Sequence, residues 1–333
     1  MPSPADRTGS AAVGPRAYAF RVPTSATVLE RSWRPSWPCP VASILVSLRR
    51  GHGDPTFQLD PDGTVWKGWR TPEGLVTLAV RPMSGDGEVR ATAWGPGAEW
   101  VLDGLPELLG DGDDPSGFDP EHEVLAAAWR AHPHWRVPRT RLVMDALVPA
   151  IIEQKVTGKE AFTSQRRLVR RYGEQAPGPE AERRRLMVLP TPETLRSIPS
   201  WEWLDLMVDP ARSRTVVRVA ERASALERLV DLPAEEADRR LRTLPGVGVW
   251  TSAETRARAL GDADAVSFGD FHVAKDIGWA MTGKPVDDER LAELLEPYRP
   301  HRLRVQMLVN QAGLRRPRRA PRMTLPRHLP GRV

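Results

Sequence analysis

The residues with the clearest capacity for chemistry lie at positions 244–252, where the sequence reads Leu-Pro-Gly-Val-Gly-Val-Trp-Thr-Ser. A helical pattern precedes this segment at 234–243, and another follows at 249–260. Gly246 and Gly248 permit positive φ angles and leave backbone N–H groups unobstructed. At the start of a helix such N–H groups, together with the helix dipole, bind an anion such as a phosphate. A plain turn between helices has the same sequence features, so the segment needs a second signal.

An aspartate supplies that signal. Asp270 lies 20 residues after Trp250, at the end of a Gly-containing loop at 261–269. A carboxylate beside an anomeric carbon stabilises an oxocarbenium-like charge and can orient or deprotonate a water molecule. The simpler interpretation is that Asp270 is the N-cap of a helix predicted at 271–281, because Asp is a common cap. The two roles are compatible.

Together these segments resemble the helix-hairpin-helix DNA glycosylases, in which the hairpin is followed by a Gly/Pro-rich loop and a catalytic aspartate. Residues 151–161, Ile-Ile-Glu-Gln-Lys-Val-Thr-Gly-Lys-Glu-Ala, are similar to the family segment near the flipped nucleotide. Residues 298–302, Tyr-Arg-Pro-His-Arg, are similar to the segment that opens the last helix. The β-rich first part resembles the 3-methyladenine DNA glycosylase II branch. The resemblance covers roughly residues 16–314 and is most specific over 244–272.

The resemblance implies that Asp270 is catalytic and that the hairpin binds DNA phosphate. The DNA-binding residues that it implies are Gln154, Lys155, Gly246, Gly248, Thr251, His272 and Arg302. Of these, Gln154 and Lys155 would support the gap left by the flipped nucleotide or the base opposite it. For His272 simple packing is an equal alternative. Family hairpins often hold a monovalent cation on backbone carbonyls, so the resemblance implies such a cation but no cofactor.

Three further residues are expected to line the base pocket: Trp250, Glu254 and Asn310. Lyase members of the superfamily carry a lysine at the position of Trp250, so its tryptophan implies a monofunctional enzyme that uses water. The indole could stack on an electron-poor alkylated purine, or it could be part of the core. Glu254 and Asn310 stand where the alkylpurine branch often has aromatic residues, and they could read base edges by hydrogen bonding. The alternative places Glu254 on the solvent side of its helix.

The elements that must position these residues fall into two parts. Short strand-like runs at 56–59, 64–69, 75–81 and 88–94 are separated by turn residues and predict an antiparallel meander. Residues 41–48 could be a strand or a short helix, and 98–109 are expected to form a helix. Beyond the acidic segment 110–118 the pattern is helical, with Thr140 as the expected cap of a helix at 142–151. We therefore predict an α+β fold, an N-terminal antiparallel sheet domain with helices followed by an all-α helix-hairpin-helix domain.

The expected division of the chain is a disordered arm at 1–15, a sheet domain at 16–109, a linker at 110–118, the helical domain at 119–314 and a basic disordered tail at 315–333. The tail contains seven arginines and no acid. Without it the chain has 41 basic and 43 acidic side chains, so the formal charge of +5 is a property of the tail. The tail could attract phosphate or be solvated without a function.

Composition excludes several classes of protein. The 333 residues contain a single cysteine, Cys39. This rules out a disulfide framework, a zinc site with several cysteine ligands and a cysteine-ligated iron–sulfur cluster. No run of about 18 uncharged apolar residues could span a bilayer. Neither the acids of 110–117 nor His132 and His134 have metal-ligand spacing, so we expect no metal site.

The sequence therefore predicts a monomeric, cytoplasmic, nucleoid-associated DNA glycosylase that excises alkylated purines from double-stranded DNA. A non-catalytic DNA-binding protein is one alternative, because a hairpin alone binds phosphate. A glycosylase for another lesion, such as 8-oxoguanine, is the other. Because the adenine-mismatch branch normally carries an iron–sulfur cluster, a single cysteine disfavours it.

Overall fold

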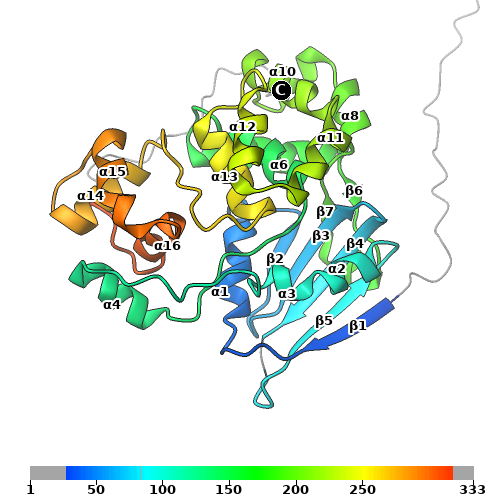
Figure 1. Cartoon of the computed structure of the whole chain (residues 1–333). Helices are drawn as coiled ribbons and strands as arrows, with labels where there is room; N and C mark the ends of the chain where they lie inside the picture. Colours follow the sequence, from blue (N-terminus) through cyan, green and yellow to red (C-terminus); the bar gives the residue numbers. More distant parts are fainter. Residues whose placement is uncertain (1–27, 83, 318–333) are drawn as a thin grey trace, which may run out of the picture.

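A computed structural model describes residues 28–82 and 84–317. The arm predicted at 1–15 and the tail from residue 318 onward lie outside these residues. In Figure 1 the sheet lies below, most helices lie above it, and α4 with α14–α16 forms a group to the left. None of the helices in the described part is long and apolar enough to cross a bilayer.

The meander predicted between residues 56 and 94 is confirmed. Its strands are β2 (Phe57–Leu59), β3 (Val65–Thr71), β4 (Gly74–Arg81) and β5 (Val89–Trp94), and each pairs antiparallel with the next. A further strand, β1 (Val28–Trp33), pairs with β5, so the order is β1-β5-β4-β3-β2. The turn after β2 ends at Gly63, whose φ of 85° is a conformation that glycine adopts without strain.

Short helices cover the sheet. Residues 41–48 form α1 (Val41–Leu45) and a 3-10 turn, which decides between the two expected alternatives in favour of helix. The single helix expected at 98–109 is instead α2 (Ala98–Asp103) and α3 (Leu105–Leu108), interrupted at Gly104. A Cβ at Gly104 would lie 2.1 Å from Arg141 Nη2, so glycine allows the Arg141 guanidinium to pack at this break.

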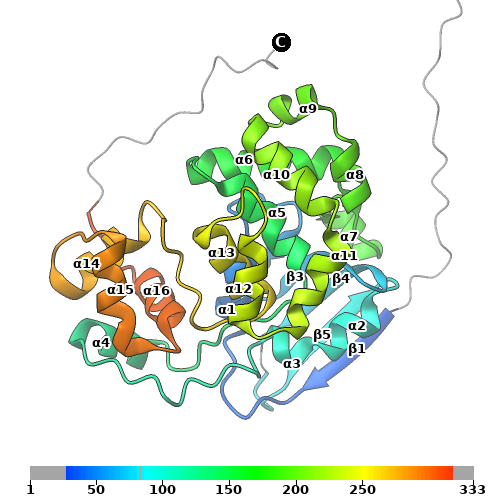
Figure 2. The same ribbon diagram turned by 45° about the horizontal axis from the view of Figure 1, so that its top comes forward.

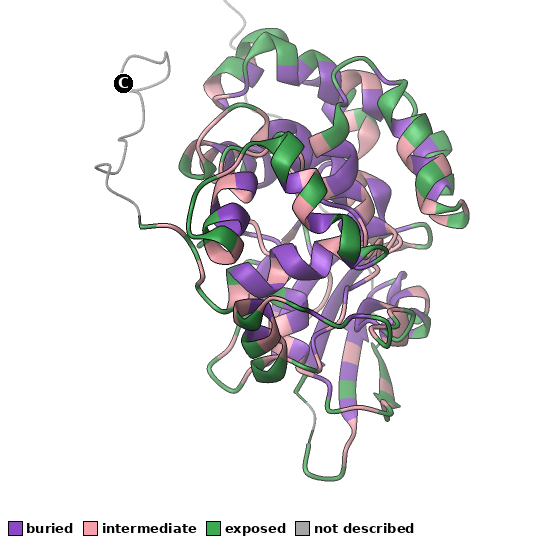
Figure 3. Ribbon diagram, turned by 60° about the vertical axis from the view of Figure 1, so that its left-hand side comes forward, coloured by how far each residue is buried: buried purple, intermediate pink, exposed green. Residues whose placement is uncertain are grey.

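The remaining helices build the second part of the molecule. They are α4 (Glu123–Ala131), α5 (Val143–Glu153), α6 (Gly158–Tyr172), α7 (Pro179–Arg184), α8 (Pro192–Ser197), α9 (Ser200–Asp205), α10 (Pro210–Ala220), α11 (Ala223–Glu227), α12 (Ala234–Arg242), α13 (Val249–Ala259), α14 (Val273–Thr282), α15 (Asp288–Leu295) and α16 (Arg302–Gln311), with a small β6 (Glu174–Gln175)–β7 (Met187–Val188) ribbon. Helix α5 is central: most of its residues are buried, and it packs on α6, α10 and α13. Figure 3 shows the same pattern, with buried residues along the strands and the central helices and exposed residues on outward turns. The predicted α+β fold class is confirmed.

The prediction that Thr140 caps the helix at 142–151 is wrong. Helix α5 begins at Val143, and its first N–H groups donate to a side chain from elsewhere in the chain. Glu227 of α11 accepts from Val143 N at 2.7 Å and from Met144 N at 2.9 Å. Thr140 Oγ1 accepts from Leu142 N, at 3.3 Å, which lies before the helix. Unpaired N–H groups at a helix start can be satisfied by any nearby acceptor, and here tertiary packing supplies one.

The segment predicted as a linker, 110–118, is packed. Both carboxylate oxygens of Asp113 accept from Arg304 Nη2 of α16, at 2.7 and 2.8 Å, and both side chains are almost completely buried. Phe118 belongs to the apolar core formed with α4, α14 and α16. Figure 2 shows α4 beside α16, although more than 170 residues separate them in sequence. This segment therefore fixes the α14–α16 group against the rest of the molecule.

Candidate active site

The hairpin between α12 and α13 turns at Gly246, where the structure requires a glycine. Gly246 has a φ of 94°, and a Cβ there would lie 2.2 Å from Thr215 Oγ1 of α10. Gly248 precedes α13, and a Cβ there would meet no atom within 4 Å. No side chain caps the N-terminus of α13. The first N–H groups of α13 therefore have no side-chain cap, and Val249 beside them is 41 % exposed, so an anion can approach them there.

Gln154 and Thr251 contact each other, which corrects the phosphate contact expected of the Thr251 hydroxyl and leaves the DNA contact of Gln154 a prediction. Gln154 Nε2 donates to Gly246 O at 2.8 Å and to Thr251 Oγ1 at 2.7 Å. Thr251 is only 2 % exposed, so its hydroxyl cannot reach a phosphate. The amide nitrogen of Gln154 joins the end of α5 to the hairpin. These two residues support the hairpin from inside.

Lys155 follows directly and is exposed. Its φ is 53°, in the left-handed region that residues with a Cβ rarely adopt. Because Gln154 is bonded to the hairpin, Lys155 must lie beside it. Unfavourable backbone conformations of this kind concentrate at functional sites. The contact of Lys155 with DNA stays a prediction.

The structure brings Asp270 and Trp250 together across the intervening 20 residues. Trp250 Nε1 donates to Asp270 Oδ2 at 3.2 Å. Asp270 Oδ1 accepts from His272 N at 2.7 Å and Val273 N at 3.1 Å, so this carboxylate also caps α14. Both Asp270 and Trp250 are half-buried. The carboxylate therefore has the cap role and, at the same time, faces the indole at the start of α13.

An exposed aromatic side chain lies beside Asp270 and is not among the site residues predicted from the sequence. Phe271 is 68 % exposed, and Lys275 Nζ lies 3.6 Å from the centre of its ring. The centres of the Phe271 and His272 rings are 5.0 Å apart, and the two rings are nearly perpendicular. The helix expected to begin at 271 begins at Val273. Phe271 therefore lies before the helix, where its ring is not directed to the core. The only sequence signal was its position next to the aspartate.

Glu254 is neither in an open pocket nor on the solvent side, so both expectations for it are wrong. Its side chain is 12 % exposed. Its Oε1 accepts from Ser267 Oγ at 2.5 Å, and its Oε2 accepts from Arg258 Nη1 at 2.7 Å. Burial raises the pKa of Glu254, but the charges of Arg258 and Arg50 and the Ser267 hydrogen bond together hold it below its usual range.

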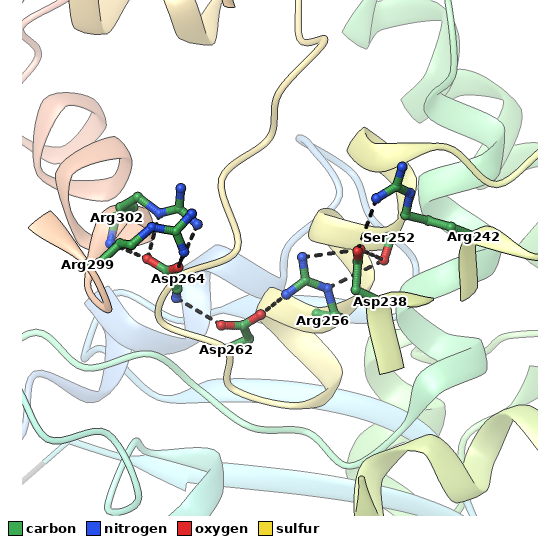
Figure 4. A network of polar contacts seen from close by, with 8 residues as sticks. All are labelled: Asp238, Arg242, Ser252, Arg256, Asp262, Asp264, Arg299 and Arg302. Carbon is green, nitrogen blue, oxygen red and sulfur yellow. Dashed lines mark hydrogen bonds and ion pairs between the residues drawn. The ribbon is translucent and has the colours of Figure 1, made fainter. Parts of the chain in front are cut away.

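Arg302 contacts another loop residue rather than facing outward. Its Nε donates to Asp264 Oδ1 at 2.7 Å and its Nη2 donates to Asp264 Oδ2 at 2.6 Å, and the side chain is 11 % exposed. Figure 4 shows the guanidinium groups of Arg302 and Arg299 side by side against Asp264, and Asp262 facing Arg256 of α13. A bidentate pair of this kind leaves the guanidinium little capacity for phosphate. The expected DNA contact of Arg302 is therefore corrected.

Asn310 lies apart from the other expected pocket residues. It is exposed near the end of α16, and its Oδ1 accepts from Arg315 Nη2 at 3.1 Å. Within the described residues this hydrogen bond connects Asn310 to Arg315 and not to Trp250 or Asp270. A role for Asn310 in the base pocket stays a prediction without support from a contact.

The hairpin carbonyls offer only a partial fit to a cation. Backbone oxygens are suitable ligands for hard cations. Those of Leu244, Pro245 and Gly246 already accept from Val247 N, Arg218 Nη1 and Gln154 Nε2. The cation implied by the resemblance therefore stays a prediction. In the described ranges, 28–82 and 84–317, no three His, Cys, Asp or Glu residues are grouped to hold a metal ion.

Comparison with known proteins agrees with the sequence resemblance. No protein-family model matches the chain. It is 32 % identical over 189 residues to the probable bifunctional transcriptional activator/DNA repair enzyme AlkA of Mycobacterium tuberculosis, a match that covers 55 % of this chain and 34 % of that protein. The chain thus spans about a third of the length of the curated relatives it matches.

Solved structures share the fold. The 3-methyladenine DNA-glycosylase of Archaeoglobus fulgidus superposes with a TM-score of 0.63 at 18 % identity, over 86 % of this chain and 98 % of that one. The Clostridium acetobutylicum 8-oxoguanine glycosylase/lyase, solved with double-stranded DNA, superposes with a TM-score of 0.59 at 13 % identity, over 80 % and 89 %. The fold is that of the helix-hairpin-helix DNA glycosylases, and the resemblance to this superfamily is confirmed.

Proposed function

We propose that this chain, which has the fold of the helix-hairpin-helix DNA glycosylases, hydrolyses the N-glycosidic bond of damaged purines in double-stranded DNA. The contact between Asp270 and Trp250 carries the proposal. It places a half-exposed carboxylate at the start of the helix whose N–H groups suit a phosphate. The cap of α14 uses only Oδ1, so it does not explain why Oδ2 lies beside the hairpin, where a negative charge weakens the binding of phosphate. This argues against the non-catalytic alternative.

Binding must first expose the reacting bond. A glycosidic bond inside a duplex is inaccessible, so the nucleotide is flipped out, at a cost of a few kcal/mol that is least for a damaged base. The N–H groups of the hairpin would bind a phosphate of the distorted strand. Lys155, exposed beside the hairpin, would lie against the gap in the base stack. These contacts orient the flipped nucleotide toward Asp270.

The chemical step follows from the charge of the transition state. As the bond between the sugar and the base nitrogen breaks, its electron pair leaves with the base and positive charge develops on the sugar. The Asp270 carboxylate stabilises that charge and orients a water molecule, whose oxygen bonds to the anomeric carbon while its proton is released. The indole N–H of Trp250 holds Oδ2 in place. The products are the free base and an abasic site.

We propose alkylated purines as the preferred substrates. The face of an indole attracts a cationic ring, and the Trp250 ring lies next to the acid. A cationic alkylpurine also leaves more readily than a neutral base, so a base pocket with few aromatic side chains is enough for its excision. Since the carboxylate of Glu254 is paired inside the protein, it does not contribute to this selectivity. The fold alone does not choose the lesion, because it is shared with a protein described as an 8-oxoguanine glycosylase/lyase.

The test is release of free bases from four duplexes that carry 7-methylguanine, hypoxanthine, 8-oxoguanine or a mismatched adenine. We expect release of 7-methylguanine to be fastest. Faster release of 8-oxoguanine would replace the proposed substrate but keep the reaction. Binding to all four duplexes without release of any base would favour the non-catalytic alternative.

Trp250 also predicts the type of glycosylase. A tryptophan cannot form a Schiff base with the sugar, so borohydride should trap no covalent protein–DNA adduct during turnover. Lys155 and Lys159 are the exposed lysines that follow α5. An adduct that persists after both are replaced by glutamine would contradict a mechanism that uses water directly.

A further inference from the structure

The loop that ends at Asp270 depends on side chains for its position. From Leu260 to His272 no residue belongs to a helix or strand. Gly261 and Gly269 have φ angles of 70° and 86°, which only glycine adopts without strain. Most backbone hydrogen bonds within the loop are local, such as Phe268 N to Val266 O and Asp270 N to Ser267 O. Such a segment has many accessible conformations unless other elements restrict it.

Ser267 is the residue that joins the second half of the loop to the helices. It is 1 % exposed. Its Oγ donates to Glu254 Oε1 of α13 at 2.5 Å and accepts from Gln306 Nε2 of α16 at 3.1 Å, while its backbone N donates to Gln306 Oε1 at 3.2 Å. Its own carbonyl accepts from Asp270 N at 3.2 Å. One buried residue thus contacts two helices and the backbone of Asp270.

Glu254 is suited to hold this residue strongly. Hydrogen bonds that involve an ionised group are roughly twice as strong as neutral ones. Arg258 Nη1 pairs with the other carboxylate oxygen at 2.7 Å, so the charge remains balanced within the protein. Trp250, which contacts Asp270 Oδ2, lies one turn earlier on the same helix. Helix α13 therefore contacts both the carboxylate of Asp270 and the loop that carries it.

The first half of the loop has a separate set of contacts, drawn in Figure 4. Asp262 pairs with Arg256 of α13, and Asp264 pairs with Arg302 of α16. Arg256 also lies 3.4 Å from Asp238 of α12, so this set continues into the hairpin. These pairs hold residues 262 and 264, which lie eight and six residues before Asp270, whereas Ser267 lies three residues before it. Nearer to Asp270, Gly269 N donates to Asp288 Oδ2 of α15 at 2.8 Å, but this hydrogen bond is exposed. The buried contacts next to Asp270 are therefore those of Ser267.

We propose that Glu254 and Gln306 are positioning residues, which act through Ser267 to fix the Asp270 carboxylate against Trp250. This inference rests on the proposed glycosylase reaction. A displacement of about 1 Å in a reacting group can lower a rate roughly a hundredfold. Loss of the Glu254 charge therefore slows bond cleavage for every substrate, whereas a residue in the base pocket would affect substrates selectively.

The principal variant is Glu254→Gln, with Ser267→Ala as a second variant that leaves the Glu254–Arg258 pair intact. For each we expect a tenfold or larger loss of the single-turnover rate, equal for 7-methylguanine and hypoxanthine, with unchanged Kd for DNA. Glu227→Gln is the matched control, because it makes the same substitution at a largely buried carboxylate outside the loop. It should lower Tm and leave the rate unchanged.

A double variant separates positioning from general destabilisation. In the Asp270→Asn background, Glu254→Gln should change the residual rate by less than twofold, because the group that it positions is already altered. A loss that persists in that background, or one confined to 7-methylguanine, would overturn the proposal.

Hydrogen–deuterium exchange gives a readout that does not need activity. Peptides that cover 261–273 should exchange at least tenfold faster in Glu254→Gln and Ser267→Ala than in wild type or Glu227→Gln. Unchanged exchange would overturn the positioning role even if wild type released no base. Release of no base by wild type, with faster loop exchange in the variants, would instead contradict only the proposed function.

Discussion

Helix α13 borders two groups of charged side chains that differ in how their charges are balanced. On the sheet side, Arg50 Nη1 lies 3.1 Å from Glu153 Oε1, and both side chains are nearly buried. Close by, Asp145 accepts from Trp69 Nε1 at 3.0 Å, with Lys67 Nζ 4.0 Å away. On the hairpin side, Asp270 accepts from an indole N–H and two backbone N–H groups, all of them neutral donors.

This difference distinguishes a structural carboxylate from one that can react. A guanidinium at hydrogen-bond distance neutralises the field of a carboxylate, as it does for Glu153. Neutral donors fix the orientation of Asp270 but leave its negative charge available to stabilise positive charge on a substrate. Asp270 is also half-buried rather than enclosed, so a nucleotide can approach it. Proximity to charged residues thus says less about function than the type of partner.

The largest expected effect is on the hairpin side. Asp270→Asn retains the size and the cap but removes the charge, so we expect the single-turnover rate of base release to fall roughly a thousandfold. Affinity for damaged DNA should change little, because the hairpin N–H groups remain. Single-turnover kinetics and an electrophoretic mobility shift assay measure the two quantities. If affinity falls as far as the rate, Asp270 is a structural cap, like the paired carboxylates on the sheet side.

On the sheet side the expected effect is on stability. Arg50→Leu leaves Glu153 buried without its partner, which typically costs about 3–5 kcal/mol. Urea denaturation measures this loss. Arg90→Leu is the matched control, because Arg90 forms an exposed pair with Asp86 worth at most about 1 kcal/mol. Equal losses for the two variants would show that the sheet-side pair is as well solvated as a surface pair.

The smallest expected effect concerns DNA affinity beside Asp270. Phe271→Ala should raise Kd for damaged DNA roughly tenfold, because stacking of a base on an aromatic ring contributes about 1–3 kcal/mol. Trp201→Ala is the matched control: its ring is 66 % exposed, close to the 68 % of Phe271, but it lies on α9. Fluorescence anisotropy with labelled duplex gives both values. The same Kd for both variants would exclude Phe271 from the interface.

Local sequence predicted much of the fold. The turns between residues 56 and 94 are short and rich in Gly, Pro and Asp, so the strand ends could be placed without knowledge of the rest of the chain. The bounds of strand β1 could not be predicted in this way, because its partner β5 lies some 60 residues away in the sequence. For the same reason the Glu227 cap of α5 could not be foreseen: the acceptor is 84 residues from the N–H group that it satisfies.

The sequence alone determined the hairpin, with Gly246 at a positive φ, and the 20-residue interval between Trp250 and Asp270. Both are properties of the chain over short distances, set by backbone sterics and loop length. Only the tertiary structure decided the direction of the polar side chains on the flanking helices. Glu254, Arg302 and Thr251 all face inward, toward Ser267, Asp264 and Gln154. A buried polar group must find a partner, and these partners come from segments that only the packed fold brings within reach.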